Sequence, residues 1–340
     1  MSEEASLLQQ TANRVFAACV GRDLAGTHAH ISESRLTGVM TEEFSGGGSC
    51  WELALPILFS AGEHALLYPI AESILAACIL SASGMALPSG ILSLAHSANG
   101  LVAAQEHDHL VFSGVLRQVA AGGDASAIAA VLQHDSVPYA VCFPRGEAKA
   151  MERHKNLADE PFADFVFEHA RVPAAQTAWT TEKLYRAMAL ARVCQMSGAI
   201  SAALSLSVGY TRQREQFGRP LATFQAIQQQ LAVLAEEEAA ARAAAASACR
   251  AADGGEASFE IAAAKLRANH AAAIAASIAH QVHGAIGFTR EYALQKFTRR
   301  LWAWRSEYGN ERRWAAELGS RAAHAGAEGF WPALVSGFAG

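Results

Sequence analysis

The 340-residue chain lacks the cysteine patterns that mark disulfide frameworks, zinc sites or redox pairs. Its six cysteines form no CxxC pair and are scattered over positions 19, 50, 78, 142, 194 and 249. None lies in a motif that would make it a catalytic nucleophile. This usage predicts reduced, mostly buried thiols and a cytoplasmic protein.

Long apolar runs and concentrated positive charge are also missing. No uninterrupted apolar run reaches the roughly 18 residues that cross a membrane, so we expect no membrane span. The net charge is −5 without a basic stripe of interleaved aromatics, which argues against a nucleic-acid partner. The acidic start, residues 1–5, has no signal-peptide pattern. The Gly-rich stretch at residues 44–49 lacks Gly-Lys-Ser/Thr, so it predicts a plain turn rather than a P-loop.

What the chain does contain is enough apolar material for a large core. Hydrophobic residues make up 51% of the sequence, and its length suits two or three domains. Helical spacing dominates residues 1–90, including one helix predicted over 63–80 across Pro69. Short apolar runs between turns predict strands over 91–172. The alanine-rich pattern over 181–325 predicts a bundle of three or four long helices.

The most informative stretch lies between two long helices predicted at residues 181–211 and 224–252. Gly218 and Pro220 break the helical pattern between them. Three arginines crowd this break, namely Arg212, Arg214 and Arg219. Because a guanidinium binds phosphate oxygens bidentately, the turn suits a phosphate or diphosphate. The alternative is an ordinary solvated turn.

Two strings in this half of the chain resemble the acyl-CoA dehydrogenases, a family of flavin enzymes. Arg214-Glu-Gln-Phe-Gly-Arg-Pro220, followed by Phe224-Gln225, is similar to the signature turn of that family. Gln281-Val-His-Gly-Ala-Ile-Gly-Phe288 is similar to its Gln-x-x-Gly-Gly-x-Gly-Phe/Tyr segment. The two strings lie about as far apart as the family places them, and together they are specific.

The resemblance implies a mostly α fold with three domains. Residues 1–90 would form a shortened N-terminal helical domain, and residues 91–175 a small middle β-barrel domain. Residues 176–328 would form a C-terminal four-helix bundle that dimerises and binds FAD.

The resemblance also implies which residues hold FAD. Arg214 would bind the diphosphate, Phe217 would pack near the adenosine, and Gln225 would form a hydrogen bond nearby. Gln281 and Gly284 would come from a neighbouring subunit, because this family builds each flavin site across a dimer interface. The alternative for these last two residues is a helix C-terminus capped by glycine.

The chain departs from the family pattern at three places. Ala285 stands where the family has a second glycine. Arg117-Gln-Val-Ala-Ala-Gly-Gly-Asp124 has no Trp or Thr at the position expected to contact the flavin ring. An earlier string, used by the family for flavin and acyl-CoA, is represented only by Ser93-Leu-Ala-His-Ser-Ala98. We therefore expect the flavin-ring side of the site to be incomplete in this subunit.

Desaturation of an acyl thioester needs a desolvated carboxylate to remove the α-proton. Glu307 is the predicted base by resemblance, although an ungapped comparison puts Tyr308 where the family has its Glu. The family's other position lies in the helix before the Arg-rich turn, where this chain has no carboxylate after Glu182. The alternative is an ordinary exposed Glu307 paired with Arg305 or Arg312.

His280 and His283 are one helical turn apart, but no Cys, Asp or Glu completes a zinc set near them, so no metal is predicted. His283 is expected to face the cofactor or the subunit interface. Three tryptophans at helical spacing are expected to pack in the core or the interface, namely Trp302, Trp304 and Trp314.

The predicted function is FAD-dependent α,β-dehydrogenation of an acyl-CoA thioester, in lipid catabolism. The expected partners are an electron-transfer flavoprotein and either a second copy, as homodimer or homotetramer, or a second acyl-CoA dehydrogenase-like subunit. The shortened chain resembles the small subunits of such heteromers. The alternatives are a non-catalytic partner subunit and a flavin monooxygenase on the same fold.

Overall fold

A computed structural model describes residues 2–45, 50–95, 97–106 and 109–336. The chain divides into two compact units. The mixed unit contains residues 2–54 and 66–188, and the helical unit contains residues 55–65 and those from 189 onward. The predicted division at residues 90 and 175 stays a prediction. The turn predicted at residues 44–49 lies mostly outside the described residues.

Helices open the mixed unit: α1 (Glu3–Cys19), α2 (Leu24–Ser34), η1 (Leu36–Gly38), α3 (Glu42–Ser45), the start of α4 (Trp51–Glu63) and α5 (Ile70–Ala82). Ser2 and Asp23 cap α1 and α2, because each side-chain oxygen accepts a backbone N–H of the first turn. The single helix predicted over residues 63–80 is wrong. Helix α4 ends at Glu63, and Pro69 stands directly before α5, where its missing N–H costs no helical hydrogen bond.

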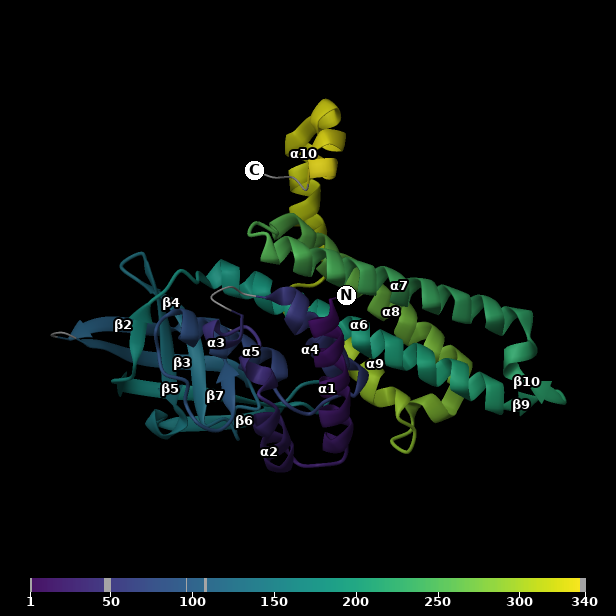
Figure 1. Cartoon of the computed structure of the whole chain (residues 1–340), viewed down its shortest axis with the longest axis horizontal. Helices are drawn as coiled ribbons and strands as arrows, with labels where there is room; N and C mark the ends of the chain where they lie inside the picture. Colours follow the sequence, from purple (N-terminus) through teal and green to yellow (C-terminus); the bar gives the residue numbers. More distant parts are fainter. Residues whose placement is uncertain (1, 46–49, 96, 107–108, 337–340) are drawn as a thin grey trace. The chain divides into compact units, whose positions relative to one another are not determined.

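The strands predicted over residues 91–172 are present and form two four-stranded sheets (Figure 1). One sheet has the order β1-β4-β5-β8, formed by Leu92–Leu94, Ala127–His134, Val137–Pro144 and Ala174–Gln176. The other has the order β2-β3-β7-β6, formed by Ser97–Glu106, His109–Ala120, Pro161–Ala170 and Ala150–Lys155. Among the described residues neither sheet closes, so the predicted barrel is corrected to a pair of open sheets.

Aromatic residues fill the space between the two sheets. The ring of Phe143 on β5 lies 5.5 Å from that of Phe112 on β3 and 4.6 Å from that of Phe167 on β7. Along β7, partly exposed and buried residues alternate from Phe162 to Phe167, as the two-residue period of a strand requires.

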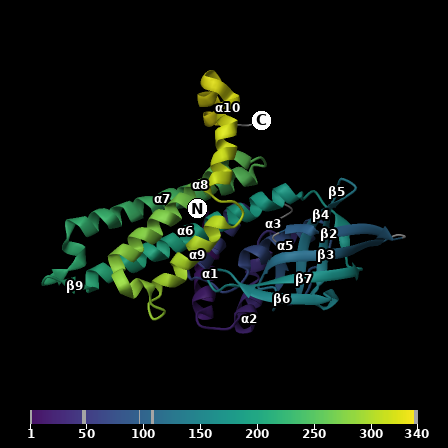
Figure 2. The same cartoon turned by 180° about the vertical axis from the view of Figure 1, so that it is seen from behind.

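The helical unit is a bundle of α6 (Thr181–Gln213, from residue 189), α7 (Gln225–Asp253), α8 (Ser258–His283), α9 (Leu294–Ser306) and α10 (Glu311–Ser336), together with residues 55–65 of α4. The helices predicted at 181–211 and 224–252 are confirmed to within two residues. The third long helix of the predicted bundle, α8, ends at His283, where the 3-10 turn η4 (Gly284–Phe288) follows. Figures 1 and 2 show α6 and α7 joined at the end that carries the short hairpin β9–β10.

Two glycines let α4 and α6 approach closely within the helical unit. A Cβ atom on Gly62 would lie 1.9 Å from the carbonyl oxygen of Gln195, and one on Gly198 would lie 1.9 Å from that of Phe59. No larger residue fits at either position without moving a helix backbone.

Two helical stretches in the described residues are long and apolar enough to cross a membrane by length and composition alone. They are Thr181–Gln213 and Ser258–Phe288, and 89% and 50% of their most apolar windows are buried inside the protein. Core helices of a bundle have the same composition, because they are apolar on several faces.

Candidate functional site

The Arg-rich turn is a tight hairpin between α6 and α7. Strand β9 (Glu215–Gln216) pairs with β10 (Arg219–Pro220), and the two residues between them have positive φ, 52° at Phe217 and 78° at Gly218. Such a turn matches the twist of a hairpin, and glycine accepts its second position without strain. The sequence break at Gly218 and Pro220 therefore marks a real reversal of the chain.

The side chains of this hairpin are turned outward. Phe217 is 90% exposed, and Arg214 and Gln225 are exposed. The Arg219 guanidinium lies 4.1 Å from the centroid of the Phe224 ring, so a cation–π contact already engages it. Within the described part of the chain, the Arg214 guanidinium has no hydrogen-bond or ion-pair partner. Of these two arginines, Arg214 is thus the one available to an anionic ligand.

The second string forms the end of α8 and the turn η4. Gly284 has φ 65° and ψ −145°, a conformation that requires glycine, and its N–H donates to the carbonyl oxygen of His280. Gly284 thus ends the helix, as the alternative reading expected. Gln281 and Ala285 are exposed beside it. Capping of α8 explains why residue 284 is a glycine, but it gives no reason for a glutamine at the exposed position 281.

Aromatic contacts bring the two strings to the same end of the helical unit. Tyr210 lies one turn before Arg214, whose backbone N–H donates to the Tyr210 carbonyl oxygen at 2.8 Å. The Tyr210 ring stacks on the His283 ring at 4.6 Å, and His283 Nε2 lies 3.3 Å from the hydroxyl of Tyr292. One chain therefore presents both strings on neighbouring parts of its surface. His283 itself is buried in this aromatic cluster.

The two histidines in the last turn of α8, His280 and His283, face different partners. Nε2 of His280 lies 2.9 Å from the Thr298 hydroxyl, and the His280 ring stacks on Phe288 at 4.0 Å. Burial lowers the pKa of both histidines, and their mutual repulsion lowers that of His280 further. No group of three or more His, Cys, Asp or Glu in the described ranges could hold a metal ion.

The predicted base, Glu307, lies in a mostly buried ion pair. Its Oε2 accepts from Nε of Arg192 on α6 at 2.7 Å, and the two side chains are 18% and 5% exposed. The Arg192 guanidinium also donates to Oε1 of Gln195 at 2.6 Å. The sequence left open a pairing of Glu307 with Arg305 or Arg312; the pair seen here is with Arg192 of α6. Arg305 is bound to Glu311 instead, with Nε to Oε1 at 2.8 Å.

The structure also clarifies the offset between Glu307 and Tyr308. Helix α9 ends at Ser306, and Tyr308 takes a left-handed conformation with φ 52°. The Tyr308 ring is buried, 5.7 Å from the Arg192 guanidinium carbon. Glu307, not Tyr308, is therefore the residue that brings a carboxylate to Arg192 in this chain.

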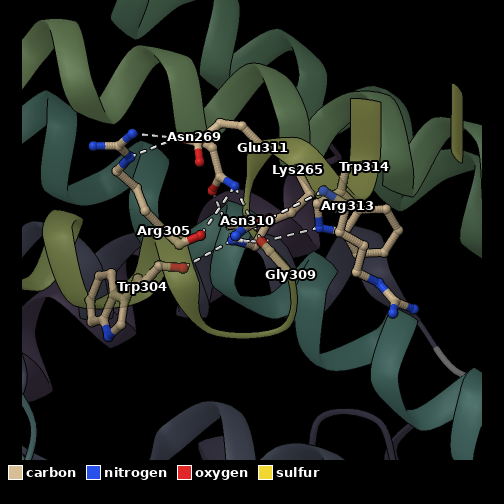
Figure 3. Close-up of polar contacts among 9 residues, drawn as sticks. All are labelled: Lys265, Asn269, Trp304, Arg305, Gly309, Asn310, Glu311, Arg313 and Trp314. Atoms are coloured by element: carbon tan, nitrogen blue, oxygen red, sulfur yellow. Dashed lines mark hydrogen bonds and ion pairs between the residues drawn. The ribbon is translucent and has the colours of Figure 1, made fainter. Parts of the chain in front are cut away.

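A polar network that the sequence reading did not find surrounds this loop (Figure 3). Lys265 and Asn269 on α8 are both fully buried, and their side chains reach the backbone of residues 304–309. Trp314 Nε1 donates to the carbonyl oxygens of Tyr308, at 3.1 Å, and Gly309, at 3.2 Å. Trp304 and Trp314 are buried, as expected.

The segments expected near a flavin ring lie in the mixed unit. Arg117 is exposed and paired with Asp164, with Nη1 to Oδ2 at 3.1 Å. The hydroxyl of Ser93 is buried and donates to the carbonyl oxygen of Ala120 at 2.6 Å. His96, in the second of these segments, lies outside the described residues. Ser93 therefore has a structural partner, and Arg117 belongs to a surface ion pair.

The mixed unit also contains a cavity of about 650 Å³ that no motif predicted. Helices α2 and α5, the turn η1 and residues 87–92 line it. Nδ1 of His28 lies 3.1 Å from the hydroxyl of Tyr68 at its wall, and burial raises the pKa of Tyr68 to about 12. Ile31, Phe44 and Leu87 add apolar surface, a mixture typical of small-molecule pockets.

Comparison with known proteins agrees with the two strings. The family model for the acyl-CoA dehydrogenase C-terminal domain matches residues 180–311. Acryloyl-CoA reductase (NADH) from Anaerotignum propionicum is 34% identical over 157 residues, which are 44% of this chain and 40% of that relative. The match thus spans about two fifths of the relative's length.

Solved structures extend the likeness to the whole fold. A Tcur3481-Tcur3483 steroid ACAD variant superposes with a TM-score of 0.83 at 23% identity, covering 96% of this chain and 99% of that one. The ChsE4-ChsE5 complex from Mycobacterium tuberculosis gives 0.83 at 19% identity, covering 95% and 98%. Residues 180–311 therefore match the C-terminal domain of the acyl-CoA dehydrogenases, and the chain as a whole has the fold of these solved structures.

Proposed function

We propose that this chain binds FAD and takes part in the α,β-dehydrogenation of an acyl-CoA thioester, with Glu307 as the base. The observation that carries the proposal is the mostly buried Glu307 carboxylate, held at 2.7 Å by Arg192. A base for an α-proton must be desolvated and fixed in direction, and this carboxylate meets both requirements. Proton removal breaks the Cα–H bond and leaves the proton on a Glu307 oxygen, while hydride leaves the β-carbon.

FAD is the cofactor of the family, and the exposed end of the helical unit fits it. The Arg214 guanidinium is a suitable donor for a diphosphate. No atom lies within 4 Å of a Cβ position built on Gly284, so a ligand can approach the backbone there. Arg214, Phe217 and Gln225 would hold the cofactor, with Gln281 and Gly284 contributed by a second chain. When bound, FAD supplies the hydride acceptor.

A second candidate is a supporting subunit in a heteromeric acyl-CoA dehydrogenase. It is favoured by the ion pair itself, since Arg192 already occupies one carboxylate oxygen of Glu307. Two structurally similar proteins are each named as a pair: Tcur3481-Tcur3483 and the ChsE4-ChsE5 complex. In this candidate a partner chain supplies the base, and electrons pass on to an electron-transfer flavoprotein in either case.

Arg214→Ala should weaken FAD binding by about 1.5–3 kcal/mol, or roughly 10- to 150-fold in Kd, because a charge-assisted hydrogen bond is lost. Titration of the apoprotein with FAD, followed by flavin fluorescence, measures the change. Arg312→Ala removes the same charge from an exposed position on α10 and serves as the control. Equal affinity in Arg214→Ala and the parent would make Arg214 an ordinary turn residue.

The protein is expected to be a dimer or larger. Apolar side chains of the helical unit remain exposed, among them Ile286 (40%) and Phe288 (65%), and a second subunit would cover such surface. Light scattering at micromolar concentration, alone and with candidate partner subunits, measures the assembly. A monodisperse monomer under all these conditions would contradict a cofactor site shared between chains.

A further inference from the structure

The C-terminal end of α9 takes its hydrogen-bond donors from another helix. Glu307 leaves the helix in an extended conformation, with φ −68° and ψ 134°. The last carbonyl groups of a helix need donors from outside it. Trp304 O accepts from Lys265 Nζ at 2.9 Å, and Arg305 O accepts from Asn269 Nδ2 at 3.2 Å (Figure 3). Side chains of α8 thus cap α9.

The same two side chains also hold the loop that follows. Gly309 O accepts from Lys265 Nζ at 3.4 Å and from Asn269 Nδ2 at 3.3 Å. Tyr308 and Gly309 have φ of 52° and 101°, and a non-glycine residue in this region persists only when its surroundings fix it. The carbonyl groups of Arg305 and Gly309, on either side of the Glu307–Tyr308 segment, are therefore both tied to α8.

We propose that Lys265 and Asn269 are positioning residues that hold the 304–309 loop so that the Glu307 carboxylate meets Arg192, and that the hold requires the protonated form of Lys265. The inference deepens the proposed function, on which it rests, by making the placement of Glu307 depend on pH. Neither side chain touches the substrate in this assignment. Both act through the loop backbone.

The surroundings of Lys265 match an ammonium group. Three oxygen acceptors lie within hydrogen-bond distance of its Nζ atom: Asn269 Oδ1 at 2.8 Å, Trp304 O and Gly309 O. An ammonium has three N–H donors, one for each oxygen. A neutral amine has two donors and a lone pair, so one of the three oxygens loses its hydrogen bond. The neutral form therefore holds the loop less firmly.

The charge of Lys265 changes near neutral pH. Burial lowers the pKa of its ammonium group to about 7. The neighbouring charges act in both directions: Glu307 and Glu311 raise this pKa, and Arg192 and Arg305 lower it. The hold on the loop is thus complete at pH values well below 7 and weakens as the pH rises through 7.

The free energy of unfolding responds to the charge of Lys265 in the opposite direction: it increases as the pH rises. The pKa of Lys265 is about 7 in the folded chain, against 10.5 for an ordinary lysine. Between these values the unfolded chain binds more protons than the folded one, so the contribution of Lys265 to the free energy of unfolding increases with pH. A loop that loosens above pH 7 is therefore not a sign of a weakening fold.

Amide hydrogen exchange of the full chain tests the proposal through residues 305–311. We expect their protection, corrected for the intrinsic rate, to fall about tenfold between about pH 6 and about pH 8.5, because a hydrogen bond to a charged group is lost. Lys265→Met should show equally low protection at both pH values. Lys296→Met, at an exposed lysine of α9, is the matched control and should behave as the parent. Protection that is independent of pH in the parent, or parental in Lys265→Met, would overturn the proposal.

A second variant keeps the test decisive if Lys265→Met does not fold. Asn269→Ala removes one pair of loop hydrogen bonds and retains Lys265, so it should lower protection at both pH values and keep the pH step. Loss of the step, or protection equal to the parent, would contradict the assignment.

Activity separates this inference from the proposed function. With FAD and an acyl-CoA, flavin bleaching by the parent should slow above pH 7, whereas Lys265→Met should be slow throughout with an unchanged KM. Absence of bleaching in the parent would refute the proposed function. The exchange result would still decide whether Lys265 and Asn269 hold the loop.

Discussion

Glu307→Gln is expected to abolish bleaching of the flavin by an acyl-CoA thioester, with a loss of at least about 10²-fold, because the α-proton has no acceptor. The substitution keeps the size of the side chain and one oxygen that can accept from Arg192. FAD and the thioester should therefore still bind. Stopped-flow absorbance at the flavin band measures the rate, and equilibrium titrations measure both affinities.

The matched control is Glu317→Gln, because Glu317 is also a partly buried carboxylate paired with an arginine, Arg321, with Oε1 to Nη2 at 3.3 Å. It should bleach at the parental rate. The thermal midpoints of both variants must be recorded, since Arg192 is only 5% exposed and depends on Glu307 for its counter-charge. If Glu307→Gln bleaches like the parent, the base lies elsewhere or on a partner chain, and this chain is the supporting subunit.

Trp314→Ala should lower the free energy of unfolding of the helical unit by about 3–5 kcal/mol, the usual cost of removing a large buried side chain. Trp314 is completely buried, and its indole N–H donates to the carbonyl groups of Tyr308 and Gly309. Removing it leaves a cavity and loosens the loop that carries Glu307. Urea unfolding followed by far-UV circular dichroism measures the loss without relying on tryptophan emission.

Trp331→Ala is the control for size and chemistry, because Trp331 is 67% exposed near the end of α10. Its urea midpoint should stay close to that of the parent, provided that both are measured at the same protein concentration. Similar shifts in the two variants would mean that Trp314 contributes no more than a surface tryptophan does. The stability of the loop would then have to come from α8 alone.

The long helices were predictable because their signal is local and repeats over many turns. Alanine-rich stretches between Thr181 and Asp253 gave bounds within two residues, since Gly218 and Pro220 mark the break between them. At Pro69, by contrast, the sequence pattern wrongly predicted one continuous helix over residues 63–80. The flanking apolar residues continue the helical pattern across it, yet α4 ends at Glu63 and Pro69 directly precedes α5, where its missing N–H costs no helical hydrogen bond.

The β-barrel was wrong because closure depends on pairing between strands that are distant in sequence. The apolar runs at residues 127–132 and 163–167 correctly predicted strands. Nothing in these runs specifies that β4 and β7 belong to different sheets. Strand β6 went unpredicted because all six of its residues are exposed and only Met151 is a large apolar residue, so an edge strand of this kind has no apolar run.

The candidate site was predictable only where a motif carried it. The Arg214 turn and the end of α8 were found from their strings. The ion pair between Arg192 and Glu307 joins residues 115 positions apart, and an unaligned sequence has no signal for that contact. Lys265 stands in an alanine-rich helix, where a lysine predicts an exposed residue. Its burial is a property of the packed bundle.

The position of residues 55–65 has a consequence for how the chain is made. This segment belongs to the helical unit, whose other residues begin at Ala189. A ribosome therefore releases it long before α6, the helix that packs closely against it at Gly62 of α4 and Gly198 of α6. Until then the apolar run Leu55-Pro-Ile-Leu-Phe59 has no native partner in its own unit, while the intervening chain emerges. Newly made protein is thus most exposed to aggregation, and most in need of a chaperone, during that interval.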